Sequence, residues 1–229
     1  MRKKTRGGTI DEAYQKIKSM MYNKELVPGQ KLFYQGLAQM LNLSTTPIAQ
    51  SLDRLARSNL VVYKPNKGYF VGEITETEAK ELFQAREAIE LYLIPLIIAN
   101  LDHKKLMDIE RHFKEYQDRG GDRRLLILKD ARFHLKIAEF ARNGILYGLL
   151  NQVLEQVCIK YRPEYIGNER FKEVVKEHWG ILQALEKGDA DDAGEKIKEH
   201  LKNGMDHVIN SLRNRTHHLL GGEEDVGYL

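Results

Sequence analysis

Hydrophobic residues recur at helical spacing along most of the chain. A short repeat over residues 34–41 predicts one helix, and a turn at 42–44 separates it from a second helix. That helix begins at Ser44 or Thr46, since both residues are good N-caps. Its apolar face repeats every three to four residues and consists of Ile48, Leu52 and Leu55. The two helices and the turn between them have the spacing of a helix-turn-helix.

The hydrophobic pattern changes from helical to alternating after Leu60. Residues 60–63 and 69–71 are predicted to form two short strands around a polar loop at 64–68. A helix-turn-helix followed by a basic hairpin is the layout of a winged helix-turn-helix, whose second helix enters the DNA major groove. We therefore predict a winged helix-turn-helix DNA-binding domain over residues 1–72, with a basic N-terminal tail.

The remainder of the chain shows no convincing alternation as far as Asn214. Thr75 and Glu78 have the spacing of a capping box, which marks the start of a helix. Helical repeats follow one another from there, so we predict an all-α effector- and metal-binding domain over residues 73–214 and a flexible C-terminal tail over residues 215–229. The predicted fold is thus mostly α, with a winged helix-turn-helix followed by an all-α helical bundle.

Charge is divided unevenly between these two parts. The net charge is +3, but residues 1–72 hold 12 basic and 4 acidic residues (+8), whereas the remainder holds 24 and 29 (−5). A basic first third is typical of a nucleic-acid-binding domain joined to a second domain; the alternative is a few solvated lysines near the N-terminus. The chain contains no run of eighteen apolar residues, which a membrane-spanning helix would need. The single cysteine, Cys158, excludes an intramolecular disulfide and fits a reducing cytoplasm.

The second helix of the pair and the wing supply the candidate DNA contacts. We expect Thr45, Thr46 and Gln50 to contact base edges, because glutamine has the geometry to pair with adenine. Basic residues of the helix and the wing are candidate phosphate contacts. The full set of predicted DNA-binding residues is Ser44, Thr45, Thr46, Gln50, Arg54, Arg57, Lys64, Asn66, Lys67 and Gly68.

Several separated motifs in this region agree in order and spacing with one family. They are Leu26-x-Pro28-Gly29-x-x-Leu32, Leu37-Ala38, Leu43-Ser44-x-Thr46-Pro47-Ile48, Leu52-x-x-Leu55 and Asn66-x-Gly68-x-x-Val71. Residues 9–72 thus resemble the DNA-binding domain of GntR-type bacterial transcription regulators. Members of that family usually carry arginines at Thr45 and Ala49, an acidic residue at Gln50 and often Glu at Tyr34. Neither Thr nor Ala can form a bidentate contact with guanine, so the usual operator sequence is not expected here.

Four polar residues interrupt the apolar faces of three predicted helices. Asp130 and His134 project side by side from one helix at spacing i, i+4, His178 lies in the stripe of a second helix, and His200 lies in that of a third. Burial of these groups without partners is costly, whereas a shared divalent cation such as Zn, Ni, Mn or Fe would satisfy all four. For any single histidine, a hydrogen-bonded core position is the commoner explanation.

The second part of the chain also resembles a known domain, the FCD ligand-sensing domain of FadR-type GntR regulators. The matching residues are Arg86 and Glu90 in AREAIE, Asp130-x-x-Phe133-His134, Asn143, Glu177-His178-x-x-Ile181 and His200. The resemblance implies that Asp130, His134, His178 and His200 hold a metal in the middle of the bundle and that small carboxylates bind next to it.

Further residues are expected around the effector. Arg86 would face an effector carboxylate, because its fork matches that group; the alternative is an i, i+4 ion pair with Glu90 on a helix surface. Asn143 either bonds the effector or caps a turn, and His207 is an alternative metal ligand. The full set of predicted effector contacts is Arg86, Asn143, Tyr161 and Arg162.

Together these features predict a cytoplasmic, homodimeric transcription regulator. It would bind double-stranded DNA at an inverted-repeat operator, because two equivalent recognition helices impose two-fold symmetry, and it would sense a small carboxylate through a divalent metal. One alternative is a metal-dependent enzyme acting on a small carboxylate, but no general base or nucleophile motif accompanies the quartet. The other is a regulator that binds a larger acyl ligand without metal, against which the complete quartet argues.

Overall fold

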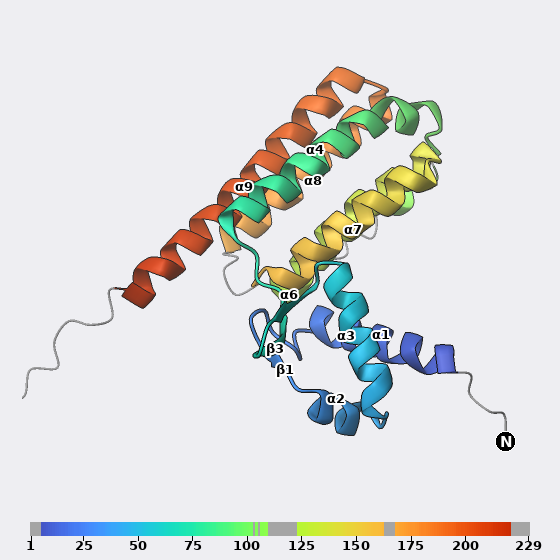
Figure 1. Cartoon of the computed structure of the whole chain (residues 1–229). Helices are drawn as coiled ribbons and strands as arrows, with labels where there is room; N and C mark the ends of the chain where they lie inside the picture. The colour runs from blue at the N-terminus through green and yellow to red at the C-terminus, as the bar shows by residue number, and fades with distance from the viewer. Residues whose placement is uncertain (1–5, 103, 105, 110–122, 163–167, 221–229) are drawn as a thin grey trace, which may run out of the picture. The chain divides into compact units, whose positions relative to one another are not determined.

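A computed structural model describes residues 6–102, 104, 106–109, 123–162 and 168–220 of the chain (Figure 1). The chain divides into two compact units. The first comprises residues 1–74 together with 154–162, and the second comprises 75–153 and 163–229. Residues 1–5 of the predicted basic tail lie outside the described part.

The first unit contains the predicted helix-turn-helix and wing. Its elements are α1 (Arg6–Tyr22), β1 (Lys31–Leu32), α2 (Tyr34–Leu41), α3 (Thr45–Arg57), β2 (Val61–Lys64) and β3 (Gly68–Val71). The strands form an antiparallel sheet in the order β1-β3-β2, with Lys31 opposite Phe70 and Val61 opposite Val71. The predicted hairpin is therefore confirmed, while β1 was not predicted because two residues are too few to show alternation.

The core of this unit follows the predicted apolar face of α3. Ile48, Leu52 and Leu55 are fully buried, as their helical spacing indicated. Asn42 ends α2 in the left-handed conformation, at φ 53°. Ser44 occupies the N-cap position of α3, but its side chain makes no capping hydrogen bond.

The described residues of the second unit form helices and the short connections between them. Its elements are α4 (Glu76–Ala99), α6 (Arg123–Ala138), the 3-10 turn η1 (Glu139–Ala141), the first part of α7 (Gly144–Lys160), α8 (Asn168–Lys187) and α9 (Ala190–Leu220). α4, α8 and α9 run side by side (Figure 1). The capping box is confirmed, because the Glu78 amide donates to Thr75 Oγ1 at 3.1 Å.

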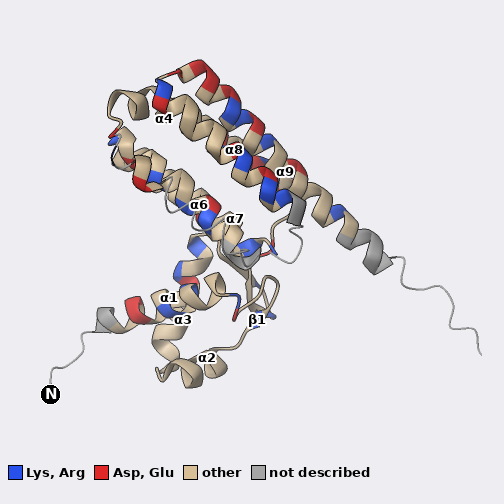
Figure 2. Ribbon diagram, turned by 180° about the vertical axis from the view of Figure 1, so that it is seen from behind, with Lys and Arg blue, Asp and Glu red and all other residues tan. Residues whose placement is uncertain are grey.

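The last helix is longer than the sequence pattern indicated. α9 continues to Leu220, so the prediction of a flexible tail from residue 215 is wrong for residues 215–220. Neither glycine nor proline occurs between Gly204 and Gly221, so no residue type there interrupts a helix. The described side chains of α9 include charges of both signs (Figure 2). Among the described residues, the helices fall short of the length and apolarity needed to cross a bilayer.

Candidate metal centre

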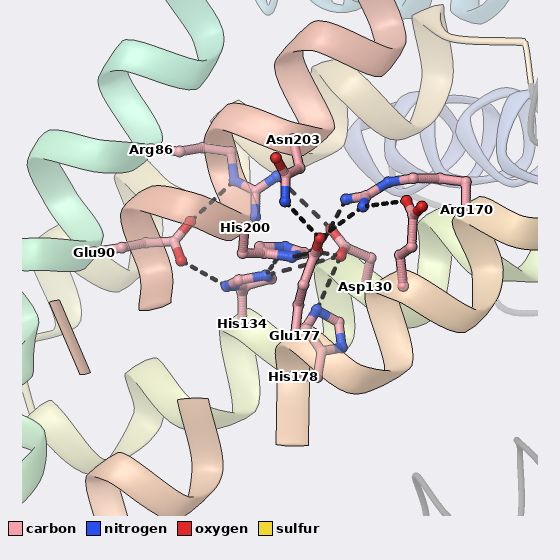
Figure 3. Close-up of polar contacts among 10 residues, drawn as sticks. Arg86, Glu90, Asp130, His134, Arg170, Glu177, His178, His200 and Asn203 are labelled. Atoms are coloured by element: carbon pink, nitrogen blue, oxygen red, sulfur yellow. Dashed lines mark hydrogen bonds and ion pairs between the residues drawn. The ribbon is translucent and has the colours of Figure 1, made fainter. Parts of the chain in front are cut away.

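Asp130, His134, His178 and His200 converge in the second unit (Figure 3). α6 supplies Asp130 and His134 from one face, α8 supplies His178, and α9 supplies His200. One ligand atom of each residue lies within 4.8 Å of the others. The three imidazoles are buried, and the Asp130 side chain is 20% exposed.

Carboxylates fix the outer nitrogens of two of these imidazoles. His134 Nδ1 lies 2.5 Å from Glu90 Oε2, and His200 Nδ1 lies 2.7 Å from Glu177 Oε2. An ionised carboxylate only accepts hydrogen bonds, so both Nδ1 atoms must donate. In the neutral tautomer, the Nε2 atoms of His134 and His200 then carry lone pairs, yet they lie 3.0 Å apart. A positive charge between them, either a proton or a metal ion, is required.

The pKa values of the surrounding groups agree with this assignment. Burial alone raises the pKa of Glu90, but His134 and Arg86 outweigh it and bring the pKa to about 2. Burial likewise raises the pKa of Glu177, and the hydrogen bonds from His200 and Arg170 bring it to about 2. Both carboxylates are thus ionised near neutral pH.

The three imidazoles differ in their preference for a proton. Burial lowers the pKa of His134, and it lowers that of His178 to about 3, so both are neutral ligands near pH 7. Burial also opposes a charge on His200, but hydrogen bonds to Asp130 and Glu177 raise its pKa. Without a metal ion, the positive charge between His134 Nε2 and His200 Nε2 is therefore best supplied by a proton on His200.

The spacing of the inner atoms fits a single ion. Asp130 Oδ1 lies 3.1 Å from His178 Nε2, 3.3 Å from His200 Nε2 and 3.8 Å from His134 Nε2. Two ligand atoms that are each about 2.1 Å from one metal are at most about 4.2 Å apart, a limit that the three Asp130 distances meet, although the ligand atoms of the quartet span up to 4.8 Å. Three imidazoles and a carboxylate also form a donor set that suits Zn, Ni, Mn or Fe. The residues present therefore fit a divalent metal.

A further layer of contacts holds the ligands in place (Figure 3). Arg170 donates to both oxygens of Glu177, at 2.7 and 3.0 Å, and Asn203 Nδ2 donates to Glu177 Oε1 at 2.8 Å. The ring of Phe133 stacks on His178 with centroids 3.8 Å apart. Such outer contacts orient metal ligands and raise their basicity. Glu90 and Glu177 were not predicted in this role, because only the folded bundle brings them to the outer nitrogens.

The predicted effector residues fall in different places. Arg86 is 2% exposed and lies beside the quartet, with Nε 2.9 Å from Glu90 Oε1 and Nη1 3.7 Å from Asp130 Oδ2. The ion pair with Glu90 is therefore real, but it is buried and not on a helix surface. Asn143 Oδ1 accepts from the Leu146 amide at 3.1 Å, which is the capping alternative. His207 is not among the four converging residues.

Tyr161 and Arg162 belong to the first unit, whereas the quartet belongs to the second. Tyr161 is buried, and Arg162 Nη2 donates to the Pro28 carbonyl at 2.8 Å. These two residues and Arg86 thus belong to different units.

A narrow cavity opens beside the quartet within the second unit. It has room for about one water molecule. Apart from Glu90 and His134 its walls are apolar, and they come from α4, α6, α7, α8 and α9. Leu150 of α7 is one of these wall residues and is fully buried.

The predicted DNA contacts lie together in the first unit. Thr45, Thr46 and Gln50 are exposed on α3, as base-reading side chains must be. Arg54 is engaged within the unit, since its Nη1 lies 2.5 Å from Asp11 Oδ1 and its guanidinium lies over the Tyr14 ring. The other polar residues predicted to contact DNA are exposed; these are Ser44, Arg57, Lys64, Asn66 and Lys67. Gly68, at φ 90°, permits the wing turn.

A winged helix-turn-helix joined to a helical unit with a buried Asp-His quartet defines a DNA-binding transcription regulator. The model of the FCD domain matches residues 81–203, and that of the bacterial regulatory proteins, gntR family, matches residues 9–71. The chain belongs to the GntR family, in the branch that carries an FCD domain. The predicted family and the predicted fold are thereby confirmed.

Transcription regulators from two bacteria are similar to this chain over most of its length. YdhC of Bacillus subtilis (strain 168), an HTH-type transcriptional regulator, is 22% identical over 202 residues, which cover 87% of this chain and 90% of YdhC. McbR of Escherichia coli (strain K12) is 26% identical over 168 residues, which cover 72% of this chain and 76% of McbR. The solved structure of E. coli McbR/YncC has the same fold, with a TM-score of 0.76 at 22% identity, covering 89% of this chain and 98% of that one.

Proposed function

We propose that this GntR-family regulator senses a small carboxylate through a divalent metal ion held by Asp130, His134, His178 and His200. The observation that carries the proposal is the 3.0 Å approach of His134 Nε2 to His200 Nε2, while the other nitrogen of each ring faces a carboxylate. A metal ion removes the repulsion between these lone pairs and accepts a third imidazole and Asp130 as well. When bound, the ion supplies a Lewis-acidic position for an anionic ligand.

Arg86 is the residue that would select a carboxylate at this position. Its guanidinium is buried beside the quartet and pairs with Glu90 and Asp130, both of which lie at the centre. A guanidinium next to a metal ion attracts anions, and its fork fits a carboxylate. Because the adjoining cavity holds only about one water, a carboxylate can enter only if the wall side chains move. Effector binding is thereby tied to a change of conformation.

The DNA-binding half of the proposal concerns the operator. Thr45, Thr46 and Gln50 are exposed on α3 and would read base edges, while Arg57, Lys64 and Lys67 would contact phosphates. We further propose that the protein acts in the cytoplasm as a homodimer. Two equivalent copies of α3 then require an inverted-repeat operator, because the symmetry of the protein is repeated in the DNA.

The metal content of untagged protein tests this proposal. We expect close to one equivalent of a transition metal per chain by plasma mass spectrometry, and a melting temperature that falls on chelation and recovers on addition of Zn²⁺ or Mn²⁺. Protein whose melting curve is the same in chelator and in metal would contradict the metal centre. A panel of small carboxylates, added to metal-loaded and chelated protein, then tests whether effector binding needs the metal.

An enzymatic role is tested with the same panel. The relatives reported above are transcription regulators, and we propose that this chain likewise has no catalytic activity. The carboxylates should be recovered unchanged after incubation with metal-loaded protein. Consumption that scales with protein concentration would favour the enzyme instead.

A further inference from the structure

The end of α7 belongs to the DNA-binding unit. α7 is a single helix, Gly144–Lys160, and the division between the two units falls inside it, between Val153 and Leu154. Residues 154–162 thus complete a unit that otherwise consists of residues 1–74. The sequence pattern gives no sign of this, because some 80 residues separate the two segments.

Apolar contacts build this segment into the winged unit. Ile159 is fully buried within the same hydrophobic cluster as Ile17 and Met21 of α1 and Leu52 of α3. Burial of such an apolar side chain stabilises the folded unit. The segment is therefore part of the core of this unit.

Lys24 secures the end of the helix by a second kind of contact. Its Nζ donates to the carbonyl oxygens of Cys158, Ile159 and Tyr161 at 2.7, 2.9 and 3.0 Å. The last carbonyls of a helix have no partner within the helix, and a cation there is favoured by the helix dipole. Lys18 Nζ adds an ion pair with Glu155 Oε1 at 2.6 Å. Two basic residues, Lys18 on α1 and Lys24 just after it, thus hold the C-terminal end of α7.

The other part of α7 reaches the candidate metal centre. Leu150 lines the cavity beside His134 and Glu90, and it lies one helical turn before Leu154. The backbone hydrogen bonds of an α-helix make it stiff over this distance, about 14 Å from Leu150 to Ile159 at 1.5 Å per residue. Because α7 is continuous from Leu150 to Ile159, we expect a shift at Leu150 to be passed along the helix to the segment that Lys24 contacts.

We propose that α7 couples the metal and effector site to the DNA-binding unit, with the Lys24 contacts to its last carbonyls as the joint. Lys24 is a positioning residue, because it contacts neither DNA nor metal in this scheme. The coupling rests on the proposed metal centre and extends it. Because coupling is reciprocal, metal binding changes the affinity for DNA by the same factor as DNA binding changes the affinity for metal.

The test compares Lys24→Met, which keeps the aliphatic stem, with Lys16→Met as a matched control on the exposed face of α1. A DNA fragment is first selected from a random library with wild-type protein. Its dissociation constant is then measured for the chelated protein and for the protein loaded with Zn²⁺ alone or Mn²⁺ alone, and metal affinity is measured by calorimetry.

For the wild type and Lys16→Met we expect the metal to change the DNA dissociation constant by a factor within the usual range of about 5–150. For Lys24→Met the factor should fall below about 2, with metal affinity unchanged. The coupling would be overturned if metal bound to the wild type without changing its DNA dissociation constant. It would also be overturned if metal changed that constant as much in Lys24→Met as in the wild type. Either result would leave the proposed metal centre intact. Absence of metal binding would instead overturn the proposed function.

A second variant covers the case in which Lys24→Met does not fold. Glu155→Gln removes the charge that Lys18 faces and leaves the length of the side chain unchanged. It should reduce the metal-dependent factor while the melting temperature of the metal-free protein stays near that of the wild type. An unaltered factor in this variant would count against α7 as the coupling element.

Discussion

His134 Nε2 and His200 Nε2 face each other at 3.0 Å, while the outer nitrogen of each ring lies against its own carboxylate, Glu90 for His134 and Glu177 for His200. This arrangement determines the direction of each imidazole before any ligand arrives. The two carboxylates come from different helices, Glu90 from α4 and Glu177 from α8. The centre is thus preorganised to accept a positive charge.

Loss of one imidazole should remove the stabilisation by metal. At a free metal concentration 100 times the dissociation constant, binding to the folded state alone stabilises it by about 2.7 kcal/mol. We expect Zn²⁺ to raise the melting temperature of the wild type and of His207→Gln, but to have little effect on His178→Gln. Differential scanning calorimetry with and without chelator measures this. An equal response of all three proteins would show that His178 is not a ligand.

Removal of an outer carboxylate should weaken the metal without removing a ligand. Glu177→Gln keeps the shape of the side chain but takes away the charge that holds His200 Nδ1–H. Outer-shell substitutions of this type typically reduce metal affinity by about 10–100-fold. Calorimetric titration with Zn²⁺ gives the affinity, and Glu173→Gln, which alters an exposed carboxylate on the same helix, is the control. A similar loss in both variants would point to a general effect of charge.

The sequence pattern singled out the four residues that converge in the structure, but not the carboxylates that contact their rings. Asp130 and His134 share a face at spacing i, i+4, and His178 and His200 stand out because imidazoles are uncommon in apolar stripes. Glu177 is next to His178 in sequence, yet it bonds His200 on another helix, and no periodicity encodes that contact. Partners across helices depend on how the helices pack, which one sequence does not specify.

The unit to which residues 154–162 belong likewise depends on how the helices pack. The change from alternating to helical spacing near Thr75 marks the end of the wing, and the first unit does extend to Ile74. Residues 154–162 continue an ordinary helical repeat, so their place in the first unit could not be predicted. Only the folded chain shows that Ile159 is buried with α1 and α3.

The two kinds of DNA contact should respond differently to substitution. Gln50→Ala on α3 removes a proposed base contact, which should cost about 1–3 kcal/mol on the preferred sequence and relax the preference at one position of each half-site. Lys67→Met in the wing removes a proposed phosphate contact and should weaken binding to all sequences alike. The slope of the logarithm of the DNA-binding constant against the logarithm of the salt concentration should become shallower by about 1. Library selection and salt titration distinguish the two. Identical selected motifs for the wild type and Gln50→Ala would argue against base reading by Gln50.

Two glycines of the winged unit should respond in opposite directions to alanine. Gly29 has φ 81°, and a Cβ added there would lie 2.7 Å from the Glu73 carboxylate. The exposed Glu73 side chain can move aside, but a left-handed conformation costs a residue other than glycine of the order of 1 kcal/mol, so Gly29→Ala should be destabilising.

Gly36 lies within α2, where the nearest neighbour of an added Cβ is Phe33 Cβ at an ordinary 3.8 Å. Gly36→Ala should therefore stabilise the unit by about 0.5–1 kcal/mol, because alanine loses less backbone entropy in a helix. Urea titration of both variants gives the two free energies of unfolding. If Gly29→Ala were as stable as the wild type, the turn at Gly29 would tolerate a side chain. The left-handed backbone would then not be the reason for a glycine at this position.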